Sequence, residues 1–305
     1  MLKKEYLPSN SSRFPQSLLN IADCPRGLWI WGSQENISRF EELDRNLVVA
    51  IVGTRKVTEY GKTVTKEIVV GLCDYDVCVV SGMMYGVDEV AHRACVEAGG
   101  FTVGVWAGGL DTLLGGTREG VTKKILESGV VISEYGDGFM PQTWTFPARN
   151  RIVAGLSQAV VVTEAAANSG SLITAGFAAE FGREVMAVPG QVTSPLSQGV
   201  NYLLKNGARM ALGVSDVLLA IGINPDKKSE NSARNLEQIL ALVEDKVGKK
   251  IMEMIFYEGK DLDVLVLESG LSSGDLLATL SLLEVKGLVS NREGKYFANV
   301  SFAID

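Results

Sequence analysis

The stretch LVVAIVGTRKVTEYGKTVTKEIVVGLCDYDVCVVSG, residues 47–82, decides the expected fold of this chain. Its two continuous apolar runs, 47–53 and 77–82, are typical of strands with both faces buried. Between them, apolar residues recur every fourth position from Val64 to Leu72, which predicts an amphipathic helix. A strand, a helix and a second strand in this order form the repeating unit of a parallel sheet.

The same alternation continues along the chain. Further apolar runs predict strands at 101–109, 129–135, 159–165, 184–190 and 208–212. Helical spacing predicts helices at 58–72, 88–98, 119–128, 172–182 and 199–206. Apolar strands that alternate with helices predict a doubly wound α/β domain with a mostly parallel sheet.

Four parts are expected from changes in composition. They are an N-terminal cap segment at 1–46, the doubly wound domain at 47–222, a polar linker at 223–235 and a small domain at 236–305. In the small domain the pattern predicts three or four helices and then two short strands around Gly294. This order of elements is that of a winged-helix-like domain.

The small C-terminal domain is acidic. Residues 236–305 hold seven Lys and Arg residues against twelve Asp and Glu residues, a net charge of −5. Its Leu-rich candidate recognition helix offers only Lys286 as a cation. A helix that enters the major groove has to neutralise phosphates and read base edges. The composition therefore favours a protein-contact or regulatory role over the reading of duplex DNA.

Composition places the whole chain of 305 residues among packed globular proteins, with 46% hydrophobic residues. No apolar run reaches the ~18 residues that span a bilayer, and the first residues lack the apolar core of a signal peptide, so we expect no membrane insertion. Four cysteines without metal-ligand spacing predict reduced thiols in a cytoplasmic protein, with no metal site. The net charge of −7 argues against bulk electrostatic coating of DNA, although it leaves room for a local basic groove. The single histidine, His92, we interpret as structural.

Candidate binding residues stand at strand ends, where doubly wound sheets bind their ligands. Gly53, Thr54 and Arg55 follow the first strand of the opening stretch. A glycine lets an anion approach the backbone, and an arginine can donate two hydrogen bonds to it. An ordinary strand-to-helix turn also favours glycine. This pattern alone therefore fits either an anion-binding turn or an ordinary turn.

A second candidate precedes the Ala-rich helix predicted at 172–182. Ser169, Gly170 and Ser171 would lie at its amino end, with Thr174 one turn further along. Small hydroxyl residues at a helix start can seat a phosphate, although Ser169 could simply cap the helix.

The third candidate is FPARNRIVAGLS, residues 146–157. Its Arg149, Asn150 and Arg151 stand beside Phe146 and near Trp144. Arginines interleaved with aromatic rings suit a flexible nucleic-acid strand, because guanidinium groups hold phosphates while rings stack on bases. The alternative for the two arginines is a structural ion pair, with the carboxylate at position 134 or the one at position 164.

Several motifs together resemble one family. They are VAIVGTR, VSGMMYGVDEVAH, GGLD, ISEYGDG, FPARNRIVAGLS, VVVTEAAANSGSLITAGFAAEFGREVMAVPG and SQGVNYLLKNGA, spread over residues 47–222. In this order they look like the DNA-processing protein A (DprA/Smf) family. The resemblance implies an extended Rossmann-like domain, and the C-terminal pattern is similar to that family's winged-helix module.

What the resemblance implies about function is specific. Such proteins bind single-stranded DNA with little sequence preference, dimerise, and help to load the recombinase RecA during natural transformation in the bacterial cytoplasm. The family has no established cofactor or catalytic reaction. Carried over by position, the expected DNA-binding residues are Gly53, Thr54, Arg55, Ser81, Gly82, Phe146, Arg149, Asn150, Arg151, Ser169, Gly170, Ser171 and Thr174.

The chain departs from the family pattern at two places. Tyr85 stands where the family usually has a basic residue, and TLLGGTRE follows GGLD where Tyr-Pro and a later Asn are usual. We therefore expect a less basic groove, in which Tyr85 could stack on a base.

Two other functions fit parts of the sequence. GGLDTLLGGTRE and Glu164 faintly resemble the loop of Rossmann-type phosphoribohydrolases that act on nucleoside monophosphates, but the order is different and the proline is missing. A protein that chiefly binds RecA or another protein, with DNA contact secondary, is compatible with the acidic C-terminal domain.

Overall fold

The computed structural model describes residues 2–225, 240–243, 245–256, 259–292 and 294–298, so most of the expected linker at 223–235 lies outside the described residues. The chain divides into two compact units, one ending at Ile223 and one beginning at Asn224. In the described part of the chain, no helix is both long and apolar enough to cross a membrane.

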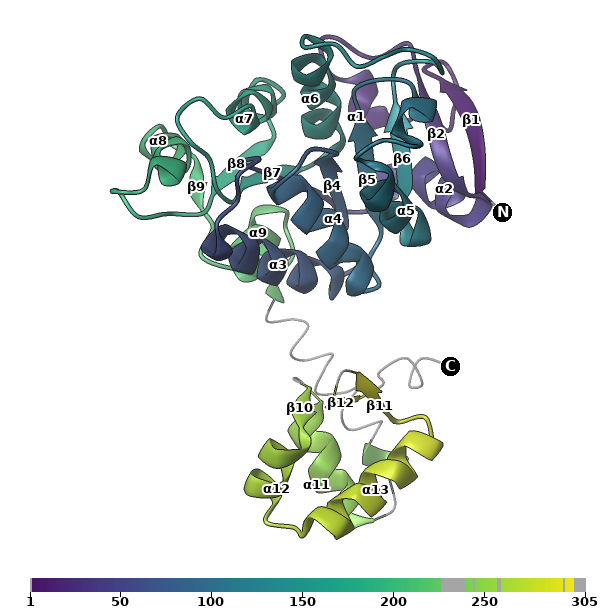
Figure 1. Ribbon diagram of the computed structural model, residues 1–305, viewed down its shortest axis with the longest axis vertical. Coiled ribbons are helices and arrows are strands. Elements are labelled where there is room, and N and C mark those ends of the chain that lie inside the picture. The colour runs from purple at the N-terminus through teal and green to yellow at the C-terminus, as the bar shows by residue number, and fades with distance from the viewer. Residues whose placement is uncertain (1, 226–239, 244, 257–258, 293, 299–305) are drawn as a thin grey trace. The chain divides into compact units, whose positions relative to one another are not determined.

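The larger unit is built on one sheet of nine strands in the order β1-β2-β6-β5-β4-β3-β7-β8-β9 (Figure 1). The strands are β1 Leu2–Pro8, β2 Gly27–Ser33, β3 Val48–Val52, β4 Cys78–Gly82, β5 Thr102–Trp106, β6 Val130–Ser133, β7 Ala159–Val162, β8 Glu184–Ala187 and β9 Arg209–Met210. All neighbours from β6 to β9 run parallel, which confirms the predicted mostly parallel α/β sheet.

The direction in which the chain adds strands reverses beside β3. Strands β4, β5 and β6 extend the sheet on one side of β3, whereas β7, β8 and β9 extend it on the other. The loops that leave β3 and β7 therefore separate toward opposite faces of the sheet, and in doubly wound folds this point is where ligands bind.

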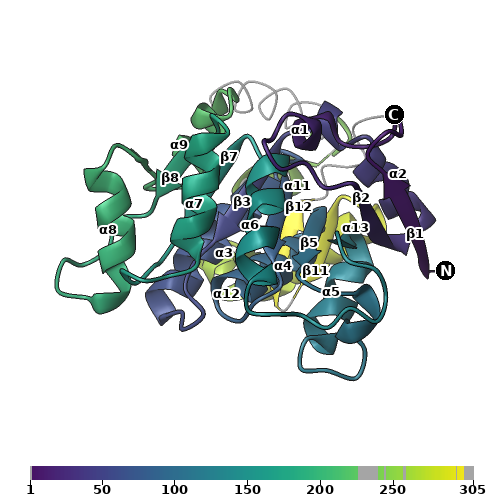
Figure 2. The ribbon, with the colours of Figure 1, turned by 90° about the horizontal axis from the view of Figure 1, so that it is seen from above.

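Two helix layers cover the sheet, and together they explain why its central strands, β3 to β7, are buried along their whole length. In β3, Val48, Ala50 and Val52 pack toward one layer, while Val49 and Ile51 pack toward the other. The first layer holds α1 Gln16–Leu19, α2 Gln34–Glu41, α6 Thr145–Leu156, α7 Ser171–Glu180 and α8 Gln198–Lys205 (Figure 2). The second holds α3 Glu59–Cys73, α4 Val87–Glu97 and α9 Val214–Ala220. Helix α5, Glu119–Ser128, packs beside α4.

The N-terminal segment differs from the expected cap. Strands β1 and β2 add two antiparallel strands to the sheet, with β2 paired to β6. Phe40 is fully buried in the main core, as is Leu18 of α1. The segment is thus part of the larger unit, because the core of the parallel sheet continues into it.

The smaller unit has its own core. It contains α11 Lys246–Ile255, β10 Lys260–Asp261, α12 Leu262–Ser269, α13 Ser273–Val285, β11 Val289–Arg292 and β12 Lys295–Ala298. Ile251, Leu265, Leu276 and Leu280 are buried together between the three helices. Strand β12 lies between β10 and β11 in a three-stranded sheet. This arrangement supports our interpretation of the unit as winged-helix-like.

Candidate functional site

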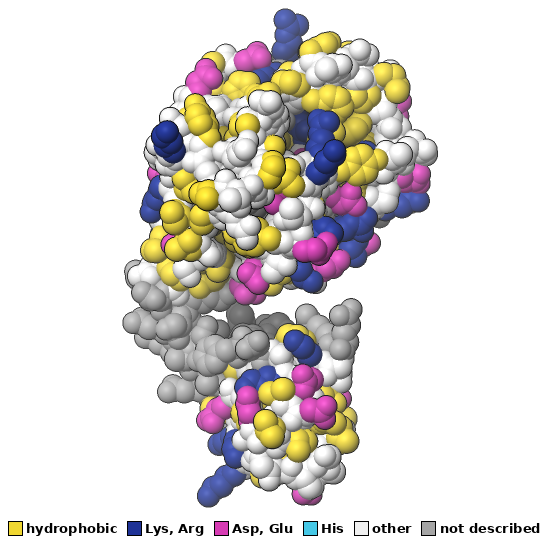
Figure 3. Space-filling model, turned by 60° about the vertical axis from the view of Figure 1, so that its left-hand side comes forward, with side chains coloured by type: hydrophobic (Ala, Val, Ile, Leu, Met, Phe, Trp, Pro, Cys, Tyr) yellow, Lys and Arg dark blue, Asp and Glu magenta, His cyan; other side chains and the backbone are white. Residues whose placement is uncertain are grey.

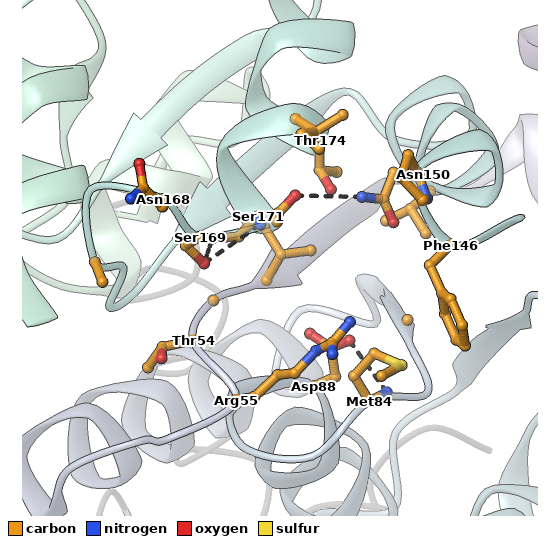
Figure 4. Close-up of a pocket in the computed structure, with 18 of the residues that line it drawn as sticks. Thr54, Arg55, Met84, Asp88, Phe146, Asn150, Asn168, Ser169, Ser171 and Thr174 are labelled. Atoms are coloured by element: carbon orange, nitrogen blue, oxygen red, sulfur yellow. Dashed lines mark hydrogen bonds between the residues drawn. The ribbon is translucent and has the colours of Figure 1, made fainter. Parts of the chain in front are cut away.

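A cavity of about 640 Å³ opens where β3 and β7 end. Four segments form its walls: the turn after β3, the turn after β4, the first half of α6, and the loop between β7 and α7 (Figure 4). Eleven of the thirteen residues expected from the sequence line it: Gly53, Thr54, Arg55, Gly82, Phe146, Arg149, Asn150, Ser169, Gly170, Ser171 and Thr174.

The turn after β3 is fixed by close backbone contacts. The Thr54 amide donates to the Glu164 carbonyl oxygen at 2.7 Å. A Cβ on Gly53 would lie 2.8 Å from that same oxygen and 2.5 Å from a Val87 methyl group, so glycine is required here. The turn then presents the exposed cations Arg55 and Lys56 to the cavity.

Arg55 is the cation most directly available to a ligand. Its side chain points into the cavity between Phe146 and the Ser169 loop (Figure 4). The guanidinium carbon lies 5.9 Å from the centroid of the Phe146 ring. That ring in turn meets Trp106 edge to face, with the centroids 6.3 Å apart. Within the described residues, Arg55 makes no ion pair, so its charge is not neutralised by a carboxylate contact.

The opposite wall is the amino end of α7. The Ser169 and Ser171 hydroxyl oxygens are 2.7 Å apart, and Asn150 on α6 donates to the Gly170 carbonyl oxygen at 3.3 Å. Gly170 is the N-cap residue, and the amide of Ser171, the first residue of the helix, donates to the Ser169 hydroxyl oxygen at 3.4 Å. The positive end of the helix dipole and several hydroxyl groups therefore face the cavity, which favours an anionic ligand.

Arg149 forms the floor of the cavity, near the buried Asp88 carboxylate. It is only 4% exposed, and it donates to the Val105 carbonyl oxygen at 2.7 Å. Burial lowers the pKa of Arg149 to about 10, against the opposing effect of the nearby Asp88 carboxylate. Burial also raises the pKa of Asp88, and Arg149 partly offsets this rise. A Cβ on Gly82 would overlap both charged groups, so this glycine makes room for the pair.

Two expected residues do not join the cavity. Arg151 donates to Asp23 and to Glu134, each at 2.8 Å, and its side chain is buried. Arg151 therefore forms the structural ion pair that was the alternative to DNA binding. It faces away from the cavity that Arg149 lines, because residues two apart on a helix point in different directions. The buried Ser81 donates to the Ile51 carbonyl oxygen at 2.6 Å.

Trp144 lies apart from the cavity lining. It is 60% exposed and packs edge to face against Tyr135 and Phe139. Of Phe146 and Trp144, only Phe146 lines the cavity.

Among the lining residues that sequence reasoning missed are Lys56, Asp88 and Asn168. Lys56 follows Arg55 directly, and this adjacency of two cations could have indicated it. Asp88 lies in the first turn of α4, and it faces Arg149 across the cavity floor. Asn168 had no distinguishing signal beyond its place in the loop before α7.

The surface around the cavity combines basic and apolar groups. Figure 3 shows Lys and Arg side chains in a hollow of the larger unit, with apolar side chains around them. Among the described residues, no group of three His, Cys, Asp or Glu side chains could hold a metal ion. Cations, a helix start and an aromatic ring line the cavity and are available for ligand recognition.

Together these features define a class, the Rossmann-like α/β proteins with a polar, partly cationic cavity at the switch point of the sheet. Within that class, the chain belongs to the DNA recombination-mediator protein A family, known as DprA or Smf, whose family model matches residues 5–222.

Relatives in this family cover most of the chain. The putative DNA processing protein DprA of Mycobacterium tuberculosis is 35% identical over 277 residues, 89% of this chain and 68% of the relative. Protein Smf of Escherichia coli is 32% identical over 295 residues, 95% of this chain and 76% of the relative.

Two solved structures are also similar. DNA processing protein A from Streptococcus pneumoniae matches with a TM-score of 0.65 and 35% identity, over 71% of this chain and 74% of that chain. The Helicobacter pylori protein, whose structure concerns its single-stranded DNA binding mode, matches with a TM-score of 0.63 and 28% identity, over 72% of this chain and 95% of that chain.

Proposed function

We propose that this protein binds single-stranded DNA in the cavity between β3 and β7. The observation that carries the proposal is Arg55, an exposed guanidinium that is not ion-paired within the described residues and lies over the ring of Phe146. A cation beside an aromatic ring meets the two needs of a flexible strand, namely phosphate neutralisation and base stacking. Family membership and the single-stranded DNA binding of the Helicobacter pylori relative add support.

In this proposal each wall of the cavity has its own role in binding the strand. Arg55 and Lys56 bind phosphate oxygens from one side, and the amino end of α7 attracts phosphate from the other. Stacking of one base on Phe146 contributes about 1–3 kcal/mol. Arg149 holds the cavity floor and does not reach phosphate, because it is buried against Asp88. Since these groups contact backbone and ring faces, sequence preference is slight.

The test compares Arg55→Ala with Arg45→Ala. Both residues flank β3, but Arg45 precedes the strand and so lies at the end opposite the cavity. With a fluorescent oligothymidylate, Arg55→Ala should weaken binding roughly tenfold or more, because a charge-assisted hydrogen bond contributes about 1.5–3 kcal/mol. The slope of log affinity against log salt should fall by about 0.7, the value for one phosphate of a single strand. Arg45→Ala should match wild type. Equal affinities for all three proteins would contradict the proposal.

The alternative function, hydrolysis of nucleoside monophosphates, has less support. Glu164 accepts hydrogen bonds from the Thr58 amide at 2.8 Å and from its hydroxyl at 2.7 Å, and it lies outside the cavity lining. Among the described lining residues, Asp88 is the only carboxylate, and it faces Arg149. We therefore propose a binding protein without a reaction of its own. Release of free base from nucleoside monophosphates would overturn this.

We further propose the finer role that the family resemblance implies. The protein would act in the cytoplasm, protect incoming single strands and help to load RecA during natural transformation. The measurement is the lag before RecA hydrolyses ATP on a strand already coated with single-strand-binding protein. The wild-type protein should shorten the lag, and Arg55→Ala should not.

A homodimer is part of the same proposal. Strand β9 is one of the two edge strands of the sheet; Met210 in it is 51% exposed, and Leu212 just after it is 73% exposed. Exposed apolar side chains beside an unpaired strand favour association. Leu212→Lys should shift the sedimentation coefficient from that of a dimer to that of a monomer, and a wild-type monomer would contradict the dimer.

A further inference from the structure

The turn between β4 and α4 exposes an aromatic ring that is stacked on a buried cation. Tyr85 is 48% exposed. The guanidinium carbon of Arg118 lies only 3.4 Å from the centroid of its ring, a close cation–π contact. Hydrogen bonds from Thr117 and then from Arg118 lower the pKa of the Tyr85 hydroxyl.

Arg118 is held firmly in this position. It is only 8% exposed, and its Nη1 donates to Glu89 at 3.2 Å. Glu89 also pairs with Arg93 at 3.0 Å, so the carboxylate is itself fixed. The Nε of Arg118 is buried without a hydrogen-bond partner among the described residues. Its charge is thus only partly compensated, and it is directed at the inner face of the Tyr85 ring.

The turn that carries Tyr85 is hydrogen-bonded to the turn after β3, which forms one wall of the cavity. The Val87 amide donates to the Thr54 carbonyl oxygen at 3.1 Å. Met84 and Asp88, on either side of the turn, line the cavity wall. Tyr85 therefore stands at the rim, next to the turn that carries Arg55.

We propose that Tyr85 and Arg118 form a stacking platform for one nucleobase of the bound strand, just outside the cavity. This inference rests on the proposed function, because the phosphate on Arg55 brings the strand to the rim. Arg118 occupies the inner face of the ring and leaves the outer face to the base. Because the guanidinium already holds the ring, little side-chain entropy is lost when a base stacks on it.

Four single substitutions test the platform. They are Tyr85→Leu, which removes the ring; Tyr85→Phe, which keeps it; Tyr6→Leu, a matched control on β1; and Arg55→Ala. Tyr6 is 44% exposed, and β1 is at the far edge of the sheet from β9, five strands from β3. Each protein is titrated with an oligothymidylate and with an abasic strand of equal length, and urea unfolding confirms that each is folded.

Tyr85→Leu should bind oligothymidylate about tenfold more weakly, in keeping with the loss of one stacked base. Tyr85→Phe and Tyr6→Leu should match wild type. On the abasic strand the Tyr85→Leu effect should vanish while the Arg55→Ala effect remains. If Tyr85→Leu binds both strands like wild type while Arg55→Ala is impaired, the platform is overturned and the cavity proposal stands. An equal loss on both strands also overturns the platform, since no base is then involved. If Arg55→Ala is unimpaired as well, the proposed function itself fails.

Discussion

Arg55, Arg149 and Arg151 carry the same guanidinium group in three different surroundings. Arg55 is exposed at the cavity, whereas Arg149 and Arg151 are 4% and 6% exposed. A buried guanidinium has already exchanged water for protein partners, so it gains little from a phosphate and loses much if its partners are removed. Substitutions of these residues should therefore separate binding from stability.

Arg151→Ala should lower the free energy of unfolding by about 3 kcal/mol, because it leaves Glu134 beside a buried gap without its partner. At a temperature where the variant is folded, its affinity for oligothymidylate should equal that of wild type. Urea titration and fluorescence anisotropy measure the two quantities. Arg55→Ala is the converse control, with normal stability and weak binding. If the Arg151→Ala protein were stable but bound oligothymidylate poorly, Arg151 would be a DNA-binding residue after all.

His92 gives the protein a defined pH dependence. Its Nε2 donates to the Gly82 carbonyl oxygen at 2.7 Å, and its Nδ1 lies 2.8 Å from the Thr102 hydroxyl oxygen. Burial lowers the pKa of His92 from 6.5 to about 4, although the hydrogen bond to Gly82 opposes this shift. The unfolded chain therefore takes up a proton near pH 6.5 that the folded chain does not take up until about pH 4.

Between pH 7 and pH 5 this difference should remove about 2 kcal/mol from the free energy of unfolding. His92 is the only histidine in the chain, so His92→Gln should abolish this part of the dependence. Urea unfolding of both proteins at several pH values measures it, and carboxylate titration cancels in the comparison. Parallel stability curves for the two proteins would show that His92 is not the source.

At the scale of elements, two turns position the cavity. The turn before α4 has Gly86 at φ 82° and ψ −128°, a conformation nearly confined to glycine. A Cβ there would also overlap the Thr54 carbonyl oxygen. The turns after β3 and β4 thus interlock, and each sets the place of the other.

Gly86→Ala should cost about 3 kcal/mol of stability, from left-handed strain together with the backbone overlap. It should also weaken binding of oligothymidylate, because the Arg55 turn has to move. Gly99→Ala is the matched control, since Gly99 has φ 74° but nothing within 4 Å of its added Cβ. That change should cost only about 1 kcal/mol and leave binding intact. Similar losses of stability and of affinity in both variants would mean that the contact between the two turns does not help to position the cavity.

The five central parallel strands, β3 to β7, could be predicted from the sequence because every residue in them is buried, so the sequence shows continuous apolar runs there. Strand β1 could not, since most of its side chains are exposed and no apolar pattern marks it. The cavity could be located from strand ends. The separate roles of Arg149 and Arg151 could not be assigned, because their partners Asp88, Asp23 and Glu134 come from other segments of the chain.

At the scale of the whole molecule, the chain consists of two units with separate cores. The core of the smaller unit is formed by its own helices, with Leu265 and Leu280 at its centre. Residues 236–305 carry a net charge of −5, and α13 contains no Lys or Arg. The acidic unit is thus unsuited to hold a phosphate backbone.

A chain that ends at residue 223 should therefore fold and bind oligothymidylate at least as tightly as the full-length protein. Circular dichroism and fluorescence anisotropy would check this, with Arg55→Ala in the shortened chain as the control. The full-length protein should also bind duplex DNA poorly. A clear loss of single-strand affinity on shortening would mean that the smaller unit contacts DNA.

The reversal of strand order beside β3 has a consequence for the kinetics of binding. Both walls of the cavity begin on adjacent, directly bonded strands of one continuous sheet. Because strands that pair within one sheet keep their relative positions, we expect the cavity to be preformed and to need no closure before a strand enters. Association should follow a single exponential whose rate rises in proportion to strand concentration, without a slower plateau. Because the encounter is between a local positive site and a polyanion, that rate should fall as ionic strength rises.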